Sequence, residues 1–441
     1  MDFWSTPDAD ENHVLFNRTH FELQRPLLQL IGAEINPHVN NWEKNCAFPG
    51  RSLFRQLGKL GVFGVSKPVE YGGLGLDFSY SICISEALGE VRCGAIPMAC
   101  AVQSDMATPA LCAHGSDALK REFLIPTVSG ERIACIGVSE RDAGSDVAGI
   151  KTTATLRDGD LRINGSKCWI TNAQQADWIC LLVNTLGLDS IPADDPHRNK
   201  SLVCVDMNSA DKSCVSVGRP IEKLGMRSSD TAEIFFDNVR VPTQNIIGEP
   251  GSGFRYQMEQ FQNERLAGVA LRQFNYPNFI GGITRKTFQL FYSVLRPLKR
   301  LLNETAAYAM RRQMFGSTAF ERHQTLRYTL AELHVEYEAL AALLYRGVAA
   351  KVHADLNTVG VNPKANSPYD ESVTVLASMA KFKAGRLARK ISDECLQIWG
   401  GNGYVWDSEV SRAFRDFRLY SIGGGCDEVM LSIVAKHIGK K

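Results

Sequence analysis

Arg312 and the glycine pair Gly400-Gly401 are residues of the types that bind phosphate. An arginine guanidinium presents a planar fork of N–H donors, and glycine lets backbone N–H groups approach phosphate oxygens closely. A turn that ends a helix would use the same glycines, so the pair alone leaves both interpretations open. The chain has no G-x-G-x-x-G after a strand and no G-x-x-x-x-G-K-[ST] loop, which argues against a nicotinamide or nucleoside triphosphate enzyme.

Three regions of different hydrophobic periodicity must position these residues. In residues 1–129 apolar side chains recur at spacings of three and four, which predicts an N-terminal helical domain. In residues 130–249 the period is two, with Asp-Gly and Asn-Gly turns, which predicts an antiparallel β-barrel or sandwich. The helical period returns in residues 250–441, for example from Asn303 to Phe315. The expected fold class is α+β, with the β domain between two helical domains.

One stretch, residues 271–292, reads as an insertion into the C-terminal helical domain. It contains Pro277 and the pair Gly281-Gly282 where a long helix would otherwise continue. Proline in a helix interior costs about 3 kcal/mol and each glycine about 1 kcal/mol. The sequence therefore predicts a loop or an interrupted helix there.

Composition excludes several classes of protein. Among 441 residues, 49 basic and 48 acidic side chains give a net charge of +1, so no global field favours nucleic acid. No apolar run approaches the roughly 20 residues that span a bilayer, and the first residues, MDFWSTPDADENH, resemble neither a signal peptide nor a basic presequence. The 12 cysteines form no C-x-x-C pair and fit buried thiols in a reducing compartment. The nine histidines form no H-x-x-x-H pair, so no metal site is expected.

The most informative segment spans residues 134–177, where a Ser/Gly-rich turn precedes alternating strands that close on Trp-Ile-Thr. This segment resembles the flavin-facing core of the acyl-CoA dehydrogenases. The resemblance implies that Trp169 and Thr171 lie against the isoalloxazine ring of FAD. It also implies that Ser139 and Ser145 belong to the loop that lines the flavin, and that Ser145 contacts the acyl-CoA.

The resemblance also places the catalytic base. In most members of the family the base is the glutamate of a Tyr-Glu-Gly-Thr motif, but the matching stretch, residues 422–428, reads IGGGCDE and has Gly424 at that position. The long-chain and isovaleryl-CoA members take the base from an earlier helix, at a Glu-Arg-Leu sequence that matches Glu264-Arg265-Leu266. Most glutamates on such helices are simply solvated, and the glycine at 424 favours Glu264 as the base. Burial beside the substrate would raise its pKa and its basicity.

Two more consequences follow from the resemblance at this end of the chain. The backbone N–H of Gly424 and a ribityl hydroxyl of the flavin would bind the thioester oxygen, and Arg265 would contact the substrate. Cys426 stands where the family usually has a threonine, so its contact with the flavin is expected to be weaker.

The family holds the diphosphate and adenosine of FAD across a subunit interface. The matching residues here are Arg312, Phe315, Gln324, Gln397, Gly400 and Gly401. A homotetramer or homodimer is therefore expected.

The implied reaction is the FAD-dependent oxidation of a saturated acyl-CoA to the trans-2-enoyl-CoA, with electrons passed to electron-transferring flavoprotein. The compartment would be the mitochondrial matrix in a eukaryote or the cytoplasm in a bacterium. Two alternatives remain open. One is an acyl-CoA oxidase-like enzyme that reacts with oxygen, and the other is a non-catalytic flavin- or acyl-CoA-binding protein, which Gly424, Cys426 and the insertion would suit.

Overall fold

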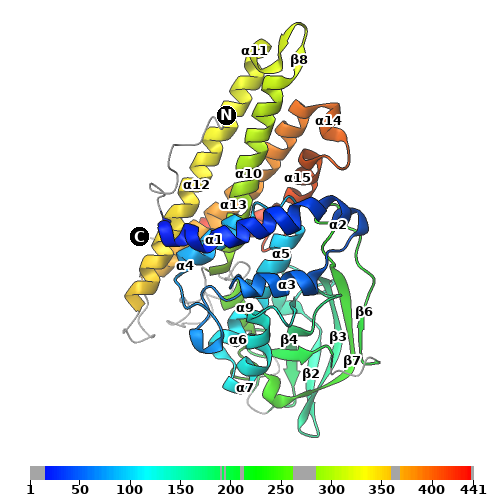
Figure 1. Ribbon diagram of the computed structural model, residues 1–441. Helices are drawn as coiled ribbons and strands as arrows, with labels where there is room; N and C mark the ends of the chain where they lie inside the picture. Colours follow the sequence, from blue (N-terminus) through cyan, green and yellow to red (C-terminus); the bar gives the residue numbers. More distant parts are fainter. Residues whose placement is uncertain are drawn as a thin grey trace.

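The computed structural model describes residues 15–188, 191–192, 195–208, 213–261, 285–358 and 368–438. Figure 1 shows N-terminal helices packed beside a β-sheet and below a long C-terminal helical bundle. The α+β class with a β domain between two helical parts is confirmed.

The N-terminal part is a set of short helices, and capping side chains define the starts of α1 and α4. Asn17 accepts hydrogen bonds from the backbone N–H groups of Thr19 and His20 at the start of α1, and Asp77 accepts one from Ser79 at the start of α4. The His20 ring also bonds the Ser79 hydroxyl at 2.8 Å, which ties α1 to α4. The helices are α1 (Arg18–Leu30), α2 (Val39–Asn45), α3 (Gly50–Lys59), α4 (Phe78–Leu88), α5 (Ala95–Ala101), α6 (Pro109–His114), α7 (Asp117–Leu119) and α8 (Ile125–Val128).

The middle part is a seven-stranded sheet in which β4 pairs with three other strands. Its strands are β1 (Ala134–Gly137), β2 (Thr153–Arg157), β3 (Asp160–Ile170), β4 (Trp178–Leu186), β5 (Lys200–Asp206), β6 (Val215–Val217) and β7 (Ala232–Pro242). The neighbours run β1-β4-β2-β3-β7-β6, and β5 also pairs with β4. The sheet is mixed, because β1 and β2 both run parallel to β4, whereas the other pairs are antiparallel as expected.

Successive side chains of β4 point to opposite faces of the sheet, and both faces are buried there. Trp178, Cys180 and Leu182 pack in a core with helical residues such as Phe123, whereas Ile179 and its alternating neighbours pack in the core of the β domain. The turn between β2 and β3 is the predicted Asp-Gly turn. The predicted turn at 164–165 is wrong, because these residues lie inside β3 at an irregularity in its register with β7.

The C-terminal part is dominated by three long helices, which form the elongated bundle in Figure 1. Its elements are α9 (Gly253–Phe261), α10 (Arg285–Arg311), β8 (Gln313–Met314), β9 (Ser317–Thr318), α11 (Ala319–Arg322), α12 (Gln324–Thr358), α13 (Pro368–Trp399), α14 (Gly401–Tyr404), α15 (Glu409–Phe417) and α16 (Asp427–Ala435). Residues 271–284 of the predicted insertion lie outside the described residues, and residues 285–292 belong to α10.

The helix expected from Asn303 to Phe315 ends earlier, at Arg311. Phe315 and Gly316 have φ angles of 50° and 88°, so they form the left-handed turn of the β8–β9 hairpin and cannot continue a right-handed helix.

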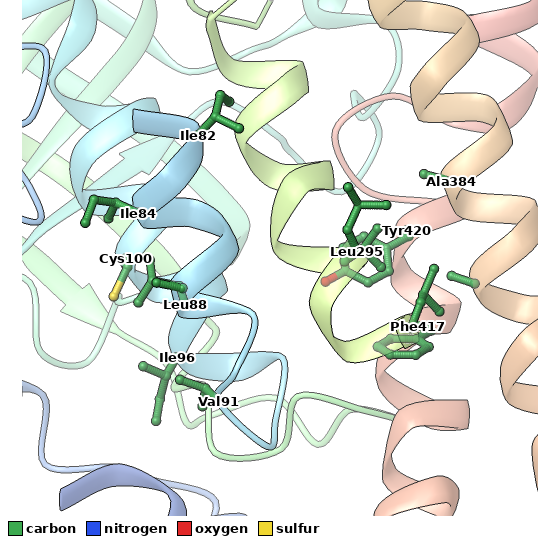
Figure 2. Close-up of a cluster of buried hydrophobic side chains, with 14 of the residues drawn as sticks. Ile82, Ile84, Leu88, Val91, Ile96, Cys100, Leu295, Ala384, Phe417 and Tyr420 are labelled. Carbon is green, nitrogen blue, oxygen red and sulfur yellow. The ribbon is translucent and has the colours of Figure 1, made fainter. Parts of the chain in front are cut away.

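One hydrophobic core joins the first and last parts of the chain. Figure 2 shows side chains of this core from α4, α5, α10, α13, α15 and the segments that follow α4 and α15. They include Ile82, Ile84, Leu88, Val91, Ile96, Cys100, Leu295, Ala384, Phe417 and Tyr420. The helical parts are therefore one packed body that supports the sheet.

Ion pairs reinforce this contact between α4 and α10. Arg296 and Arg300 of α10 both pair with Glu90, at 3.0 and 3.2 Å, and Arg300 also pairs with Glu409 of α15. The neighbouring Glu86 is buried; burial raises its pKa from 4.5 to about 7, although Arg296 lies 3.9 Å away and the Tyr345 hydroxyl donates to it.

Glu86 gives the stability of the protein a pH dependence. Folded chains keep this proton up to about pH 7 and unfolded chains only to about pH 4.5. Between these values, the contribution of Glu86 to the free energy of unfolding falls as pH rises, by at most about 1.4 kcal/mol per pH unit. We expect Glu86→Gln to gain stability relative to the unaltered protein between pH 5 and 7.5 in urea titrations. Parallel pH profiles for the two proteins would contradict this.

Candidate active site

The loop after β1 and the end of β3 meet at one edge of the sheet. The N–H of Cys168 donates to the carbonyl oxygen of Ser139 at 3.0 Å. The next residue, Trp169, has a φ of 58°, and the register of β3 with β7 shifts between Lys167 and Ile170. Trp169 is 56% exposed at this irregularity, one residue after the bond to Ser139. The structure thus presents a large aromatic face next to a polar loop.

A buried ion pair holds this loop against β3. Lys167 is fully buried and donates to Glu140 at 2.8 Å and to the carbonyl oxygen of Val138 at 3.0 Å. Glu140 also accepts from the backbone N–H of Lys151 and from Thr152. Burial lowers the pKa of Lys167 to about 8. Burial by itself would raise the pKa of Glu140, but the charge of Lys167 and these donors outweigh it and lower that pKa.

The Trp-Ile-Thr segment is fixed to the helical part by Asn172. Its buried side chain donates to the carbonyl oxygens of Ala99 and Ala134, at 3.1 and 3.2 Å. Thr171 precedes it and is half-buried, whereas Ser145 is exposed on the loop after β1. Sequence reasoning singled out neither Asn172 nor the Lys167 pair, because their partners are distant in the chain. The one local signal in the sequence was an asparagine directly after Thr171, since asparagine is one of the few residue types that accept a left-handed backbone. The structure gives Asn172 a φ of 68°.

The glycine-rich turn before α16 has two successive left-handed residues. Gly424 and Gly425 have φ angles of 65° and 96°, and Gly424 is exposed. A side chain at 424 would be strained in this conformation. Cys426 follows as the residue that caps α16, but its side chain makes no capping hydrogen bond to the helix backbone. The turn therefore presents backbone groups rather than side chains.

A second cluster forms where α10 ends beside the end of α13. Arg312 donates to the carbonyl oxygen of Ile398 at 2.9 Å, and a Cβ at Gly400 would stand 3.4 Å from the Arg312 guanidinium. Gly401 begins α14 immediately afterwards. The structure thus brings together the arginine and the glycine pair that the sequence proposed for phosphate.

The other residues expected to hold the cofactor lie around the same end of the bundle. Phe315 is at the tip of the β8–β9 hairpin, is 81% exposed, and has the guanidinium of Arg322 5.5 Å from its ring centre. Gln324 begins α12, and Gln397 lies in the last turn of α13. Glu264 and Arg265 lie outside the described residues.

The β8–β9 hairpin and the sheet lie far apart within one chain. Figure 1 places β8 and α11 at the end of the bundle opposite the sheet that carries Trp169. One chain therefore cannot bring the hairpin to its own Trp169.

The residues present fit a flavin dinucleotide. Trp169 offers an exposed aromatic face to a flat ring. The guanidinium of Arg312 beside the open backbone at Gly400 offers the donors that a diphosphate needs.

By contrast, no group of three or more His, Cys, Asp or Glu side chains in the described ranges is arranged to hold a metal ion. Among the residues that the structure describes, no helix is long and apolar enough to cross a membrane.

Comparison with known proteins agrees with this fold. The models for the N-terminal, middle and C-terminal domains of acyl-CoA dehydrogenases match residues 17–131, 135–239 and 279–439. The chain belongs to the acyl-CoA dehydrogenase family, whose members are FAD-dependent oxidoreductases of acyl-CoA oxidation, and it is an enzyme of that class.

Individual relatives span nearly the whole chain. The mitochondrial long-chain specific acyl-CoA dehydrogenase of Sus scrofa is 28% identical over 96% of this chain and 87% of its own length. The mitochondrial isovaleryl-CoA dehydrogenase of Arabidopsis thaliana is 26% identical over 97% of this chain and 93% of its own. The crystal structure of an acyl-CoA dehydrogenase from Geobacillus kaustophilus superposes with a TM-score of 0.82 at 28% identity, covering 97% of this chain and all of that one.

Proposed function

We propose that the protein oxidises a saturated acyl-CoA to the trans-2-enoyl-CoA, with Glu264 as the base and the backbone N–H of Gly424 as a donor to the thioester oxygen. The observation that carries the proposal is the turn at Gly424, where the position of the usual family base has a left-handed backbone and no side chain. A separate carboxylate must then supply the base, and Glu264 matches the sequence of the long-chain and isovaleryl-CoA members.

The chemistry assigns one role to each group. Glu264 takes the Cα proton, and the Gly424 N–H stabilises the negative charge that develops on the thioester oxygen. FAD, when bound, accepts the Cβ hydrogen with its electron pair, so two electrons leave the substrate as the Cα–Cβ double bond forms. Ser145 and Arg265 are proposed to contact the acyl-CoA.

The cofactor is proposed to lie between two copies of the chain in a homodimer or homotetramer. One copy would contribute Ser139, Ser145, Trp169, Thr171 and Cys426, and the other Arg312, Phe315, Gln324, Gln397, Gly400 and Gly401. The separation of the β8–β9 hairpin from the sheet that carries Trp169, within one chain, supports this arrangement.

Loss of the Arg312 side chain should weaken cofactor binding. We expect Arg312→Ala to raise the Kd for FAD by roughly tenfold to a hundredfold, because a charge-assisted contact contributes about 1.5–3 kcal/mol. Arg311→Ala, which removes the exposed neighbouring arginine at the end of α10, is the matched control and should bind FAD like the unaltered protein. Fluorescence quenching of added FAD measures both. Equal affinities for Arg312→Ala and the unaltered protein would remove Arg312 from the FAD site.

The electron acceptor is proposed to be electron-transferring flavoprotein. An assay of the FAD-loaded protein with palmitoyl-CoA and isovaleryl-CoA tests this, with electron-transferring flavoprotein or oxygen as the acceptor. Reduction of the flavoprotein without peroxide supports the dehydrogenase. Stoichiometric peroxide would indicate the oxidase-like alternative instead. With this acceptor, the compartment would be the mitochondrial matrix in a eukaryote or the cytoplasm in a bacterium.

A further inference from the structure

Lys381 of α13 has a fully buried side chain, which is uncommon for an ammonium group. Its Nζ donates a hydrogen bond to the carbonyl oxygen of Gly425. Gly425 directly follows Gly424. A buried lysine is therefore bonded to the same turn that carries the proposed donor to the thioester.

The same stretch of α13 contacts the chain on both sides of this turn. A Cβ at Gly385 would lie 2.9 Å from the carbonyl oxygen of Tyr420 and from the Ser421 hydroxyl, so the helix and the incoming segment are in close contact. The Nε of Arg386 lies 3.6 Å from the carboxylate of Asp427, the first residue of α16. One helix therefore contacts both ends of the turn, and the hydrogen bond from Lys381 reaches Gly425 between those two ends.

The turn needs such a restraint because of its sequence. Gly423, Gly424 and Gly425 are consecutive, and glycine has the largest conformational freedom of any residue. A backbone N–H stabilises developing charge only if it is already aimed at the oxygen. A hydrogen bond from an ammonium is roughly twice as strong as a neutral one, so it restrains the Gly425 peptide strongly.

We propose that Lys381 is a positioning residue for proton abstraction. Its ammonium holds the Gly425 carbonyl, keeps the Gly424 N–H aimed at the thioester oxygen, and places a positive charge near the negative charge that develops there. This rests on the proposed function of Gly424. Lys381 itself contacts neither the substrate nor the cofactor in this scheme.

The test uses Lys381→Met in the FAD-loaded protein, because methionine keeps most of the side-chain volume and removes the charge. Acetoacetyl-CoA is the first probe: its acidic α-carbon forms an enolate that absorbs in the ultraviolet, without any transfer of electrons. We expect the apparent pKa of the bound probe to rise in the variant. With palmitoyl-CoA or isovaleryl-CoA, kcat should fall about 100-fold while KM and FAD content stay nearly unchanged.

Lys383→Met is the matched control, because Lys383 lies two residues away on α13, is partly exposed, and pairs with Glu336 instead. It should behave like the unaltered protein. An unchanged enolate pKa in Lys381→Met overturns the inference, as does an unaltered protein that forms no enolate. If Lys381→Met does not fold, Lys381→Gln is measured instead, because glutamine also removes the charge while keeping a polar end to the side chain; an unchanged enolate pKa there overturns the inference.

The result separates this inference from the proposed function. Enolate formation that depends on Lys381, in a protein whose flavin is bleached by none of a series of straight-chain and branched acyl-CoAs, would support the positioning role and contradict the proposed oxidation.

Discussion

Replacing Glu264 with glutamine is expected to lower kcat by about 10³-fold or more, because removal of a general base costs roughly 10² to 10⁴. Glutamine is nearly isosteric with glutamate, so acyl-CoA and FAD should still bind. Stopped-flow measurement of flavin bleaching by a saturating acyl-CoA reports the chemical step directly. A variant that retains at least half of the bleaching rate would show that another group takes the proton.

The matched control for this experiment is Glu428→Gln. Glu428 is an exposed carboxylate in the first turn of α16, four residues after Gly424, so it is the described glutamate closest in sequence to the usual position of the family base. We expect the bleaching rate of Glu428→Gln to match that of the unaltered protein. A large loss there would transfer the role of base from Glu264 to Glu428.

The second large effect is expected at Glu140. Glu140→Gln leaves the ammonium of Lys167 buried without its counter-charge, and breaking a buried pair in this way costs about 3–5 kcal/mol. The loss should appear in the free energy of unfolding from urea titration. FAD retention should fall with it, because the same pair holds the Ser139 loop beside Trp169.

The double variant Glu140→Gln with Lys167→Met is the control for this prediction. It removes the stranded charge, so it should recover much of the lost stability, since a neutral replacement of a buried pair is often nearly neutral in stability. If the double variant is as unstable as the single one, packing rather than charge explains the loss.

Local rules predicted those parts of the fold whose interactions are local. The Asp158-Gly159 turn was predicted correctly, since both residues accept the left-handed conformation that a two-residue hairpin needs. The same rule failed at Asn164-Gly165, where Gly165 instead packs close to Thr152: a Cβ there would lie 2.6 Å from the threonine hydroxyl. Glycine signals an unusual backbone, and tertiary contacts decide whether it is a turn or a bulge.

The candidate site shows the same division between local and distant interactions. Motifs that resemble the family made Trp169, Gly424 and Arg312 candidates from their immediate neighbours. Lys381 could not be found in this way, because it is 44 residues from Gly425. The Lys167 pair is likewise formed across 27 residues. Buried lysines look like surface lysines in a sequence, and only packing reveals the charge they must satisfy.

An anaerobic titration of the purified, FAD-loaded protein with straight-chain and branched acyl-CoAs tests the proposed function most directly. The measured quantity is the loss of oxidised-flavin absorbance. We expect bleaching by one group of acyl-CoAs, which would establish the dehydrogenation and identify the substrate class together. Spectral shifts on binding without bleaching by any of them would contradict the proposed reaction and support a non-catalytic flavin- and acyl-CoA-binding protein.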